Sequence, residues 1–110
     1  MNKREVYIPI LYNCTLLSGQ MQEVCAGLEE EGVPFYLQER NKTDNFIQLG
    51  AEAAAISPLQ VGIGIDQTGN VCVHHEKLKP EEPYLLDNLY NGRKLGKNAA
   101  RLIKGLPLSL

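Results

Sequence analysis

Hydrophobic and polar positions along this chain alternate between a period of two, typical of strands, and a period of about 3.6, typical of amphipathic helices. The segments with the strand pattern are residues 6–12, 34–38, 59–65, 70–75 and 84–86. The segments with a helical pattern are residues 18–31, 45–56 and 93–104. The first helix is the clearest, because Met21, Val24 and Leu28 repeat at the spacing of one buried face.

Turn-forming residues set the boundaries between these segments. Ser18 is placed to cap the first helix, and Gly32 has the position of a glycine that ends one. Residues 66–69, Asp-Gln-Thr-Gly, have the chemistry of a tight hairpin turn, so the flanking strands are predicted to be antiparallel. Alternating strands and helices with one hairpin predict an α/β domain with helices on both faces of a mixed sheet. A chain of 110 residues has the size of a single domain, over residues 1–110.

Composition and charge argue against several classes of protein. The hydrophobic fraction of 44% is typical of a folded domain, and the net charge of -2 argues against binding to nucleic acid or to acidic membranes. No apolar run approaches the ~20 residues that cross a bilayer, and the amino end lacks the apolar core of a signal peptide. We therefore expect a cytoplasmic protein in which Cys14, Cys25 and Cys72 are reduced.

Three local patterns suggest cofactor chemistry, and each fails on its spacing. His74 and His75 are adjacent on a predicted strand and so point to opposite faces, while Cys72 and His74 share a face but lack two further ligands for zinc. Residues 62–64, Gly-Ile-Gly, lie inside a strand, whereas a dinucleotide fingerprint joins a strand to a helix and has a third glycine. Residues 92–97 are one residue short of a phosphate-binding loop, and we expect them to open the last helix.

The acidic run Glu29, Glu30 and Glu31 stands at the predicted end of the first helix. Carboxylates in a last turn oppose the helix dipole, at a cost of roughly a few tenths of a kcal/mol each. Consecutive helical residues are rotated by about 100°, so at most one or two of the three can face a single partner atom. The run is either a solvated helix end or the source of one oxygen ligand for a cation held mainly by another protein. No Gly-x-Ser-x-Gly elbow accompanies it, and we expect no catalytic residue in the chain.

Three segments, in order, carry a resemblance to a known family: residues 26–35 (AGLEEEGVPF), 57–64 (SPLQVGIG) and 98–107 (NAARLIKGLP). Together they resemble the small subunit of the reactivating factor, or reactivase, for coenzyme B12-dependent diol and glycerol dehydratases. The likeness covers nearly the whole chain, from the first strand to Leu108. It implies a three-layer α/β/α fold like that of the dehydratase medium subunit. The mixed sheet would have about five strands in the order 2-1-3-4-5, with strand 4 antiparallel.

The resemblance also implies a chaperone-like function without catalysis in this chain. In that family the small subunit pairs with a large subunit, an actin-like ATPase that binds ADP or ATP, as two large plus two small subunits. The small subunit transiently replaces the medium subunit beside the dehydratase large subunit, so that damaged cobalamin leaves. The chain would bind no cofactor alone and would share Mg²⁺ with the large subunit through Glu30. The partner interface implied is the acidic run, Glu29, Glu30 and Glu31.

The expected client is a dehydratase for glycerol or for 1,2-propanediol, inside or outside a bacterial microcompartment. Two other functions are open from the sequence. One is a medium-subunit-like component of the dehydratase itself, which would bind cobalamin in an absorbance titration. The other is a stand-alone binding protein that reuses the fold, since a fold does not determine a function.

Overall fold

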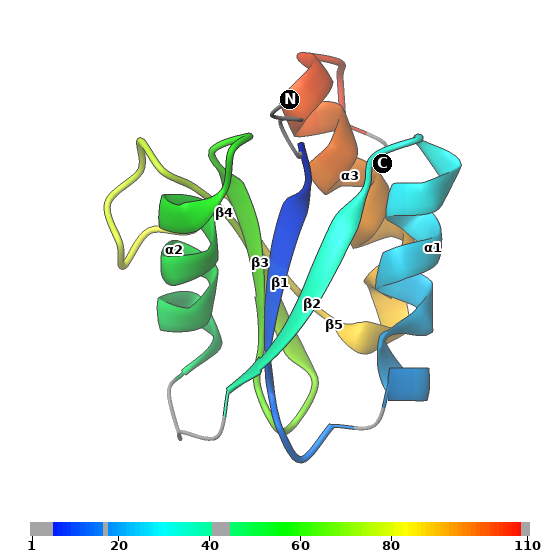
Figure 1. Ribbon diagram of the computed structural model, residues 1–110, viewed down its shortest axis with the longest axis vertical. Helices are drawn as coiled ribbons and strands as arrows, with labels where there is room; N and C mark the ends of the chain where they lie inside the picture. Colours follow the sequence, from blue (N-terminus) through cyan, green and yellow to red (C-terminus); the bar gives the residue numbers. More distant parts are fainter. Residues whose placement is uncertain (1–5, 17, 41–44, 109–110) are drawn as a thin grey trace, which may run out of the picture.

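Residues 6–16, 18–40 and 45–108 are described by the structure, which is a computed structural model (Figure 1). Its strands are β1 (Ile8–Asn13), β2 (Phe35–Arg40), β3 (Val61–Ile65), β4 (Asn70–His75) and β5 (Leu85–Asn88). Its α-helices are α1 (Gln22–Glu30), α2 (Phe46–Ile56) and α3 (Gly92–Lys104). Short 3-10 helices, Ser18–Met21 and Leu89–Asn91, lead directly into α1 and α3.

The strands form one mixed sheet in the order β2-β1-β3-β4-β5, which confirms the expected α/β fold and strand order. Strand β1 is parallel to β2 and β3, while β4 is antiparallel to β3 and β5. The β3–β4 hairpin turns at Asp66, whose carboxylate accepts hydrogen bonds from the backbone N–H groups of Thr68 and Asn70 at 2.9 Å. Burial alone would raise the pKa of Asp66, but the hydrogen bonds from Asn70 and Thr68 outweigh it and lower that pKa.

Helices cover the two faces of the sheet unequally (Figure 1). Helices α1 and α3 lie side by side on one face, over the larger core, which includes Ile10, Leu28 and Ile63. Helix α2 lies on the other face and packs over β1, β3 and β4, where a smaller core joins Leu11 to Leu49. The domain therefore has the three-layer arrangement that the sequence predicted, with two helices in one outer layer and one helix in the other.

Glycines bring α1 and α3 into direct backbone contact. A Cβ atom on Gly27 of α1 would lie 2.1 Å from the carbonyl oxygen of Arg93 in α3. A Cβ atom on Gly96 of α3 would lie 2.2 Å from the carbonyl oxygen of Val24 in α1. Side chains do not fit at such distances, so the absence of a Cβ atom at both positions allows these two helices to pack this closely.

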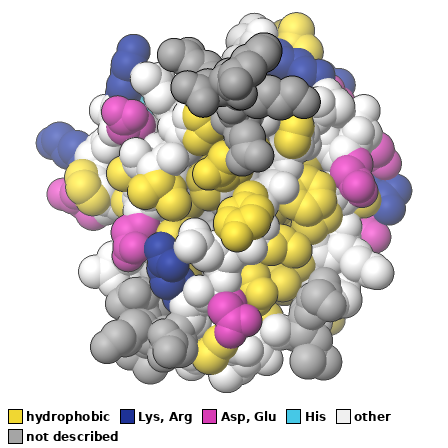
Figure 2. All heavy atoms as spheres, in the orientation of Figure 1, with side chains coloured by type: hydrophobic (Ala, Val, Ile, Leu, Met, Phe, Trp, Pro, Cys, Tyr) yellow, Lys and Arg dark blue, Asp and Glu magenta, His cyan; other side chains and the backbone are white. Residues whose placement is uncertain are grey.

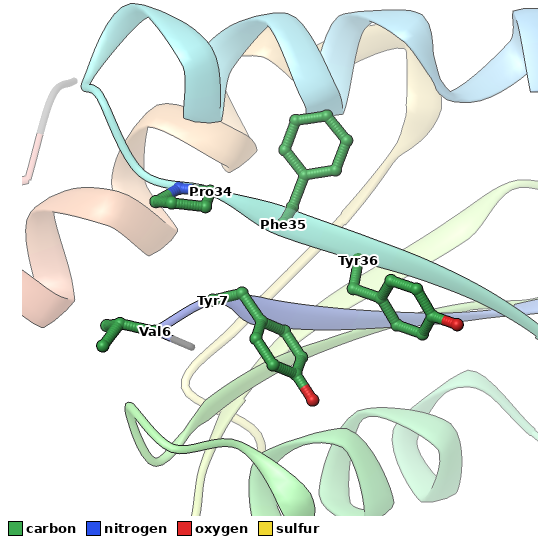
Figure 3. Close-up of a pocket in the computed structure, with 5 residues that line it drawn as sticks. All are labelled: Val6, Tyr7, Pro34, Phe35 and Tyr36. Carbon is green, nitrogen blue, oxygen red and sulfur yellow. The ribbon is translucent and has the colours of Figure 1, made fainter. Parts of the chain in front are cut away.

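On the α2 face, the described residues leave both flanks of the sheet exposed. Tyr36 of β2 is 57% exposed and Leu86 of β5 is 56% exposed, because α2 packs over the strands between them. Figure 2 shows hydrophobic side chains gathered over the middle of the viewed surface. The ring of Tyr7 meets that of Tyr36 edge to face, with the centroids 5.9 Å apart. The shallow hollow beside β2 is lined by Val6, Tyr7, Pro34, Phe35 and Tyr36 (Figure 3).

Element boundaries differ from the expected ones at several ends, and three of these differences have a clear cause in the structure. Helix α1 begins at Gln22 rather than after Ser18, because a 3-10 helix precedes it. Strand β2 continues to Arg40, since its pairing with β1 extends that far. Strand β5 spans Leu85–Asn88 because its register is set by the four residues that it pairs with on β4.

No helix in the described part of the chain is both long enough and apolar enough to cross a membrane.

Candidate partner and cation site

The acidic run predicted from the sequence lies where α1 ends. Glu30 is the last helical residue and Glu31 is the C-cap. The backbone N–H of Gly32 donates to the carbonyl oxygen of Glu29 at 3.0 Å. Gly32 has a φ of 74°, the left-handed conformation of a glycine that ends a helix. The three glutamates are therefore consecutive at a sharply closed helix end, and their side chains leave it in different directions.

Helix α3 places basic side chains against α1. Oε2 of Glu30 lies 3.2 Å from Nη1 of Arg93, and Oε1 of Glu30 lies 3.6 Å from Nζ of Lys97. Glu23, in the first turn of α1, pairs with the same guanidinium at 3.0 Å from Nε and 3.3 Å from Nη2. Arg93 and Lys97 are four residues apart and so lie on one face of α3. Each oxygen of Glu30 thus has a basic partner of its own.

Glu31 has a different pair of basic partners. Its Oε2 lies 3.5 Å from Nε of Arg101, and its Oε1 lies 3.7 Å from Nζ of Lys104, which also donates to the carbonyl oxygen of Glu31. The side chain of Glu31 is 15% exposed, whereas that of Glu30 is 41% exposed. Glu29 is exposed and forms no ion pair with another residue that the structure describes. Of the three, Glu30 is therefore both accessible and held in a defined position.

The part that α3 plays here could not be predicted from the sequence pattern. Its basic residues have the spacing of one helix face, which in a sequence is typical of a face exposed to water. In the structure Lys97, Arg101 and Lys104 instead pair with glutamates of α1. The period of four in the basic residues is visible in the sequence, but which helix they face depends on the close contact at Gly27 and Gly96.

His74 and the buried Cys72 have structural roles. His74 is buried, and its ring nitrogens lie 3.1 Å and 3.0 Å from the carbonyl oxygens of His75 and Pro80, so it ties the following loop to the sheet. Cys72 is buried, and its Sγ lies 3.1 Å from the carbonyl oxygen of Phe46. Among the residues that the structure describes, no three His, Cys, Asp or Glu side chains are grouped to hold a metal.

The two glycine-containing patterns serve packing. Gly62 and Gly64 lie inside β3, where an added Cβ atom would meet the backbone of α2 at 2.3 Å. Residues 92–97 form the first turns of α3, and Gly92 and Gly96 lie against Val24 of α1. The interpretation of both patterns as close contacts or helix starts, rather than as nucleotide-binding loops, agrees with this geometry.

The three cysteines are expected to differ widely in reactivity toward a thiol reagent. Burial raises the pKa of the Cys72 thiol to about 12, despite hydrogen bonds from backbone groups of Gly64 and Gly50. Burial and the charge of Glu29 also raise the pKa of Cys25, whereas Cys14 is exposed. With iodoacetamide at neutral pH, mass spectrometry should find Cys14 alkylated first and Cys72 alkylated only after unfolding. Early alkylation of Cys72 in the folded protein would contradict this order.

The carboxylate of Glu30 has the oxygen atoms that a hard divalent cation binds, but a single carboxylate could supply only part of the coordination. Carboxylate oxygens are the ligands that Mg²⁺ prefers, and Mg²⁺ requires a nearly octahedral set of oxygen ligands. The neighbouring groups on this surface, Arg93 and Lys97, are cationic and cannot coordinate a cation. The remaining ligands would have to come from water, a nucleotide or another protein.

Comparisons with known proteins find the same fold and identify the family that this chain resembles. The family described as dehydratase medium subunit matches residues 6–109. The propanediol dehydratase-reactivating factor small subunit of Citrobacter freundii is 43% identical over 90 residues, which cover 77% of this chain and 75% of that protein. The diol dehydratase-reactivating factor small subunit of Klebsiella michiganensis is 36% identical over 107 residues, which cover 93% of this chain and 81% of that protein.

Two solved structures have the same architecture. A chain of a glycerol dehydratase reactivase superposes with a TM-score of 0.91 at 34% identity, covering 96% of this chain and 98% of that one. A chain of a diol dehydratase-reactivating factor complexed with ADP and Mg²⁺ superposes with a TM-score of 0.87 at 33% identity, covering 97% of this chain and 100% of that one. The likeness therefore extends over the whole described domain in both sequence and structure.

Proposed function

The chain belongs to the dehydratase medium-subunit family and is a relative of reactivating-factor small subunits, and we propose that it is the non-catalytic partner of an ATPase large subunit in such a factor. The observation that carries the proposal is the full-length likeness to a reactivating factor whose structure contains ADP and Mg²⁺. In this proposal the large subunit binds the nucleotide and hydrolyses ATP. The complete factor consists of two large and two small subunits.

Subunit exchange is the proposed mode of action. The family takes its description from the dehydratase medium subunit, so a chain with this fold has the shape to occupy the place of that subunit beside the dehydratase large subunit. While it does so, the cobalamin site is open and damaged cobalamin leaves. Nucleotide exchange on the large subunit then releases the dehydratase, whose substrate is glycerol or 1,2-propanediol.

The acidic end of α1 is the proposed interface with the large subunit, and Glu30 is the proposed cation ligand. A bound Mg²⁺ would supply positive charge that joins the nucleotide site to this subunit. The position of Glu30 supports this role, because its side chain is 41% exposed and projects from the end of a helix. A carboxylate opposed to its own helix dipole is favoured by a nearby cation. Arg93 and Lys97 provide that charge in the isolated chain, and Mg²⁺ would provide it in the complex.

Co-purification with the large subunit tests the proposed function. The tagged chain, expressed with its neighbouring genes, is expected to retain a large subunit that hydrolyses ATP, and the chain alone is expected to have no ATPase activity. Reactivation is measured as recovery of activity by a dehydratase whose cobalamin has been damaged, when it is given ATP, Mg²⁺ and intact coenzyme. Failure of the complex to restore any activity, with a dehydratase that is otherwise competent, would overturn the proposal.

Glu30→Gln is expected to raise the Mg²⁺ concentration at which the two subunits assemble by roughly tenfold, because a neutral amide is a weaker ligand than a carboxylate. Sedimentation velocity with ADP and increasing Mg²⁺ gives the midpoint of assembly. Glu29→Gln is the matched control, since it removes an equal charge from the adjacent position, which has no ion pair with the described residues. A midpoint that moves as much for Glu29→Gln as for Glu30→Gln would remove the special role of Glu30.

The family description also supports a second function, that of a medium-subunit-like component of a dehydratase. Titration with cobalamin separates the two functions. A shift in the cobalamin absorbance spectrum at stoichiometric chain concentrations would favour the dehydratase component, whereas the reactivating-factor proposal expects the spectrum to stay that of free cobalamin.

A further inference from the structure

Both oxygens of the Glu30 carboxylate are engaged within the chain itself. Oε2 faces the guanidinium of Arg93 at 3.2 Å and Oε1 faces the ammonium of Lys97 at 3.6 Å. A metal ion that bound either oxygen would meet one of these cations at close range, and charges of the same sign repel. The two ion pairs therefore oppose the binding of a divalent cation to Glu30 in this geometry.

We infer that Arg93 and Lys97 compete with the divalent cation for Glu30, so that the cation is bound only when the partner's ligands add to the attraction. This inference rests on the proposed role of Glu30 as a cation ligand and concerns the regulation of that role. In the isolated chain the two basic residues occupy the carboxylate and keep it from binding Mg²⁺ alone. On assembly, Glu30 exchanges two ion pairs within its own chain for one cation shared between chains.

Glu23 allows this exchange to occur by movement of a single side chain. It binds the guanidinium of Arg93 at two atoms, with Nε at 3.0 Å and Nη2 at 3.3 Å. Such a two-point contact fixes the plane and position of an arginine. Arg93 therefore retains a partner after Glu30 turns away, and no part of the backbone has to move.

Unlike Arg93, Lys97 loses its ion pair in the same exchange. Glu30 is its ion-pair partner among the residues that the structure describes, and its side chain is 32% exposed. Once Glu30 binds the cation, the ammonium of Lys97 loses this ion pair and is hydrated instead, which its exposure allows. The neighbouring glutamate does not enter the exchange, because Glu31 is only 15% exposed and is held by Arg101 and Lys104.

Lys97→Gln is the test, in the complex of the chain with its large subunit and ADP. Removing the competing charge is expected to lower the Mg²⁺ midpoint of assembly about two- to fivefold, the range that exposed ion pairs can account for. Lys104→Gln is the matched control on the same helix, since it removes an equal charge that pairs with Glu31 instead. Its midpoint is expected to equal that of the unchanged protein. Sedimentation velocity measures assembly directly and needs no ATPase activity.

The outcome with Glu30→Gln separates this inference from the proposed function. If Glu30→Gln raises the midpoint and Lys97→Gln lowers it, the competition is supported. If Glu30→Gln raises the midpoint while Lys97→Gln leaves it unchanged or raises it, the competition is wrong and the ligand role survives. If Glu30→Gln leaves the midpoint unchanged, the ligand role is wrong and the competition is wrong with it. An equal fall for Lys97→Gln and Lys104→Gln would show a general charge effect and would also overturn the competition.

Discussion

Gly96→Ala is expected to lower the free energy of unfolding by about 2 kcal/mol or more, although alanine is normally the better helix former by about 1 kcal/mol. The sign is reversed because the new methyl group would lie 2.2 Å from the carbonyl oxygen of Val24, so α1 and α3 would have to move apart. This carbonyl oxygen belongs to the backbone, so it cannot rotate away as a flexible side chain could. Separation would also lengthen the ion pairs between Glu30 and α3.

Urea denaturation of the isolated chain, followed by circular dichroism, measures this loss as a lower midpoint. Gly19→Ala is the control, because a Cβ atom there would meet no atom of the other described residues within 4 Å, its chain neighbours apart. That variant is expected to unfold within about 0.5 kcal/mol of the unchanged protein. Equal stability of Gly96→Ala and the unchanged protein would mean that the two helices are not in backbone contact in solution.

The second large effect is expected at the centre of the sheet. Ile63→Ala should cost about 3–4 kcal/mol, because Ile63 is fully buried between β1 and β4, and the truncated side chain leaves a cavity in the larger core. For a domain of this size, that loss corresponds to a fall of roughly 12–25 °C in the melting temperature. Calorimetry of the isolated chain measures it.

Ile56→Ala gives the matched comparison for Ile63→Ala. Ile56 is the same residue type at the end of α2 and is 54% exposed, so its truncation removes little buried surface. Its melting temperature is expected to change by only a few degrees, about what 0.5 kcal/mol produces. Similar losses for both variants would contradict the assignment of Ile63 to the core.

The sequence was sufficient to predict the order of helices and strands. The 70–75 strand was predicted with its observed bounds, because turn residues flank it and its hydrophobic positions are nearly continuous. The start of α1 was not predicted, because a 3-10 helix and an α-helix have the same local polarity and differ only in their hydrogen bonding. The end of β2 at Arg40 depends on a partner strand that is far away in the sequence.

The candidate site could be predicted only in part. The acidic run is visible in the sequence, and its position at the end of a helix follows from Gly32. Only the resemblance singles out Glu30 as a cation ligand, because three adjacent glutamates cannot be told apart by their sequence pattern. The three glutamates differ in the basic side chains that they face. Those that face Glu30, Arg93 and Lys97, are more than 60 residues away along the chain. Such a pairing depends on the packing of two helices and has no local signal.

The tyrosine pair Tyr7 and Tyr36 beside β2 gives the chain an intrinsic fluorescence signal for the binding of a partner. The sequence contains five tyrosines and no tryptophan, so any tryptophan emission from a complex belongs entirely to the partner. Tyr7 and Tyr36 touch edge to face on a flank that the described residues leave uncovered. A protein that docks over this flank with a tryptophan nearby will accept excitation energy from these rings, and the tyrosine emission will fall. Docking of such a protein can therefore be followed in real time without attaching any dye.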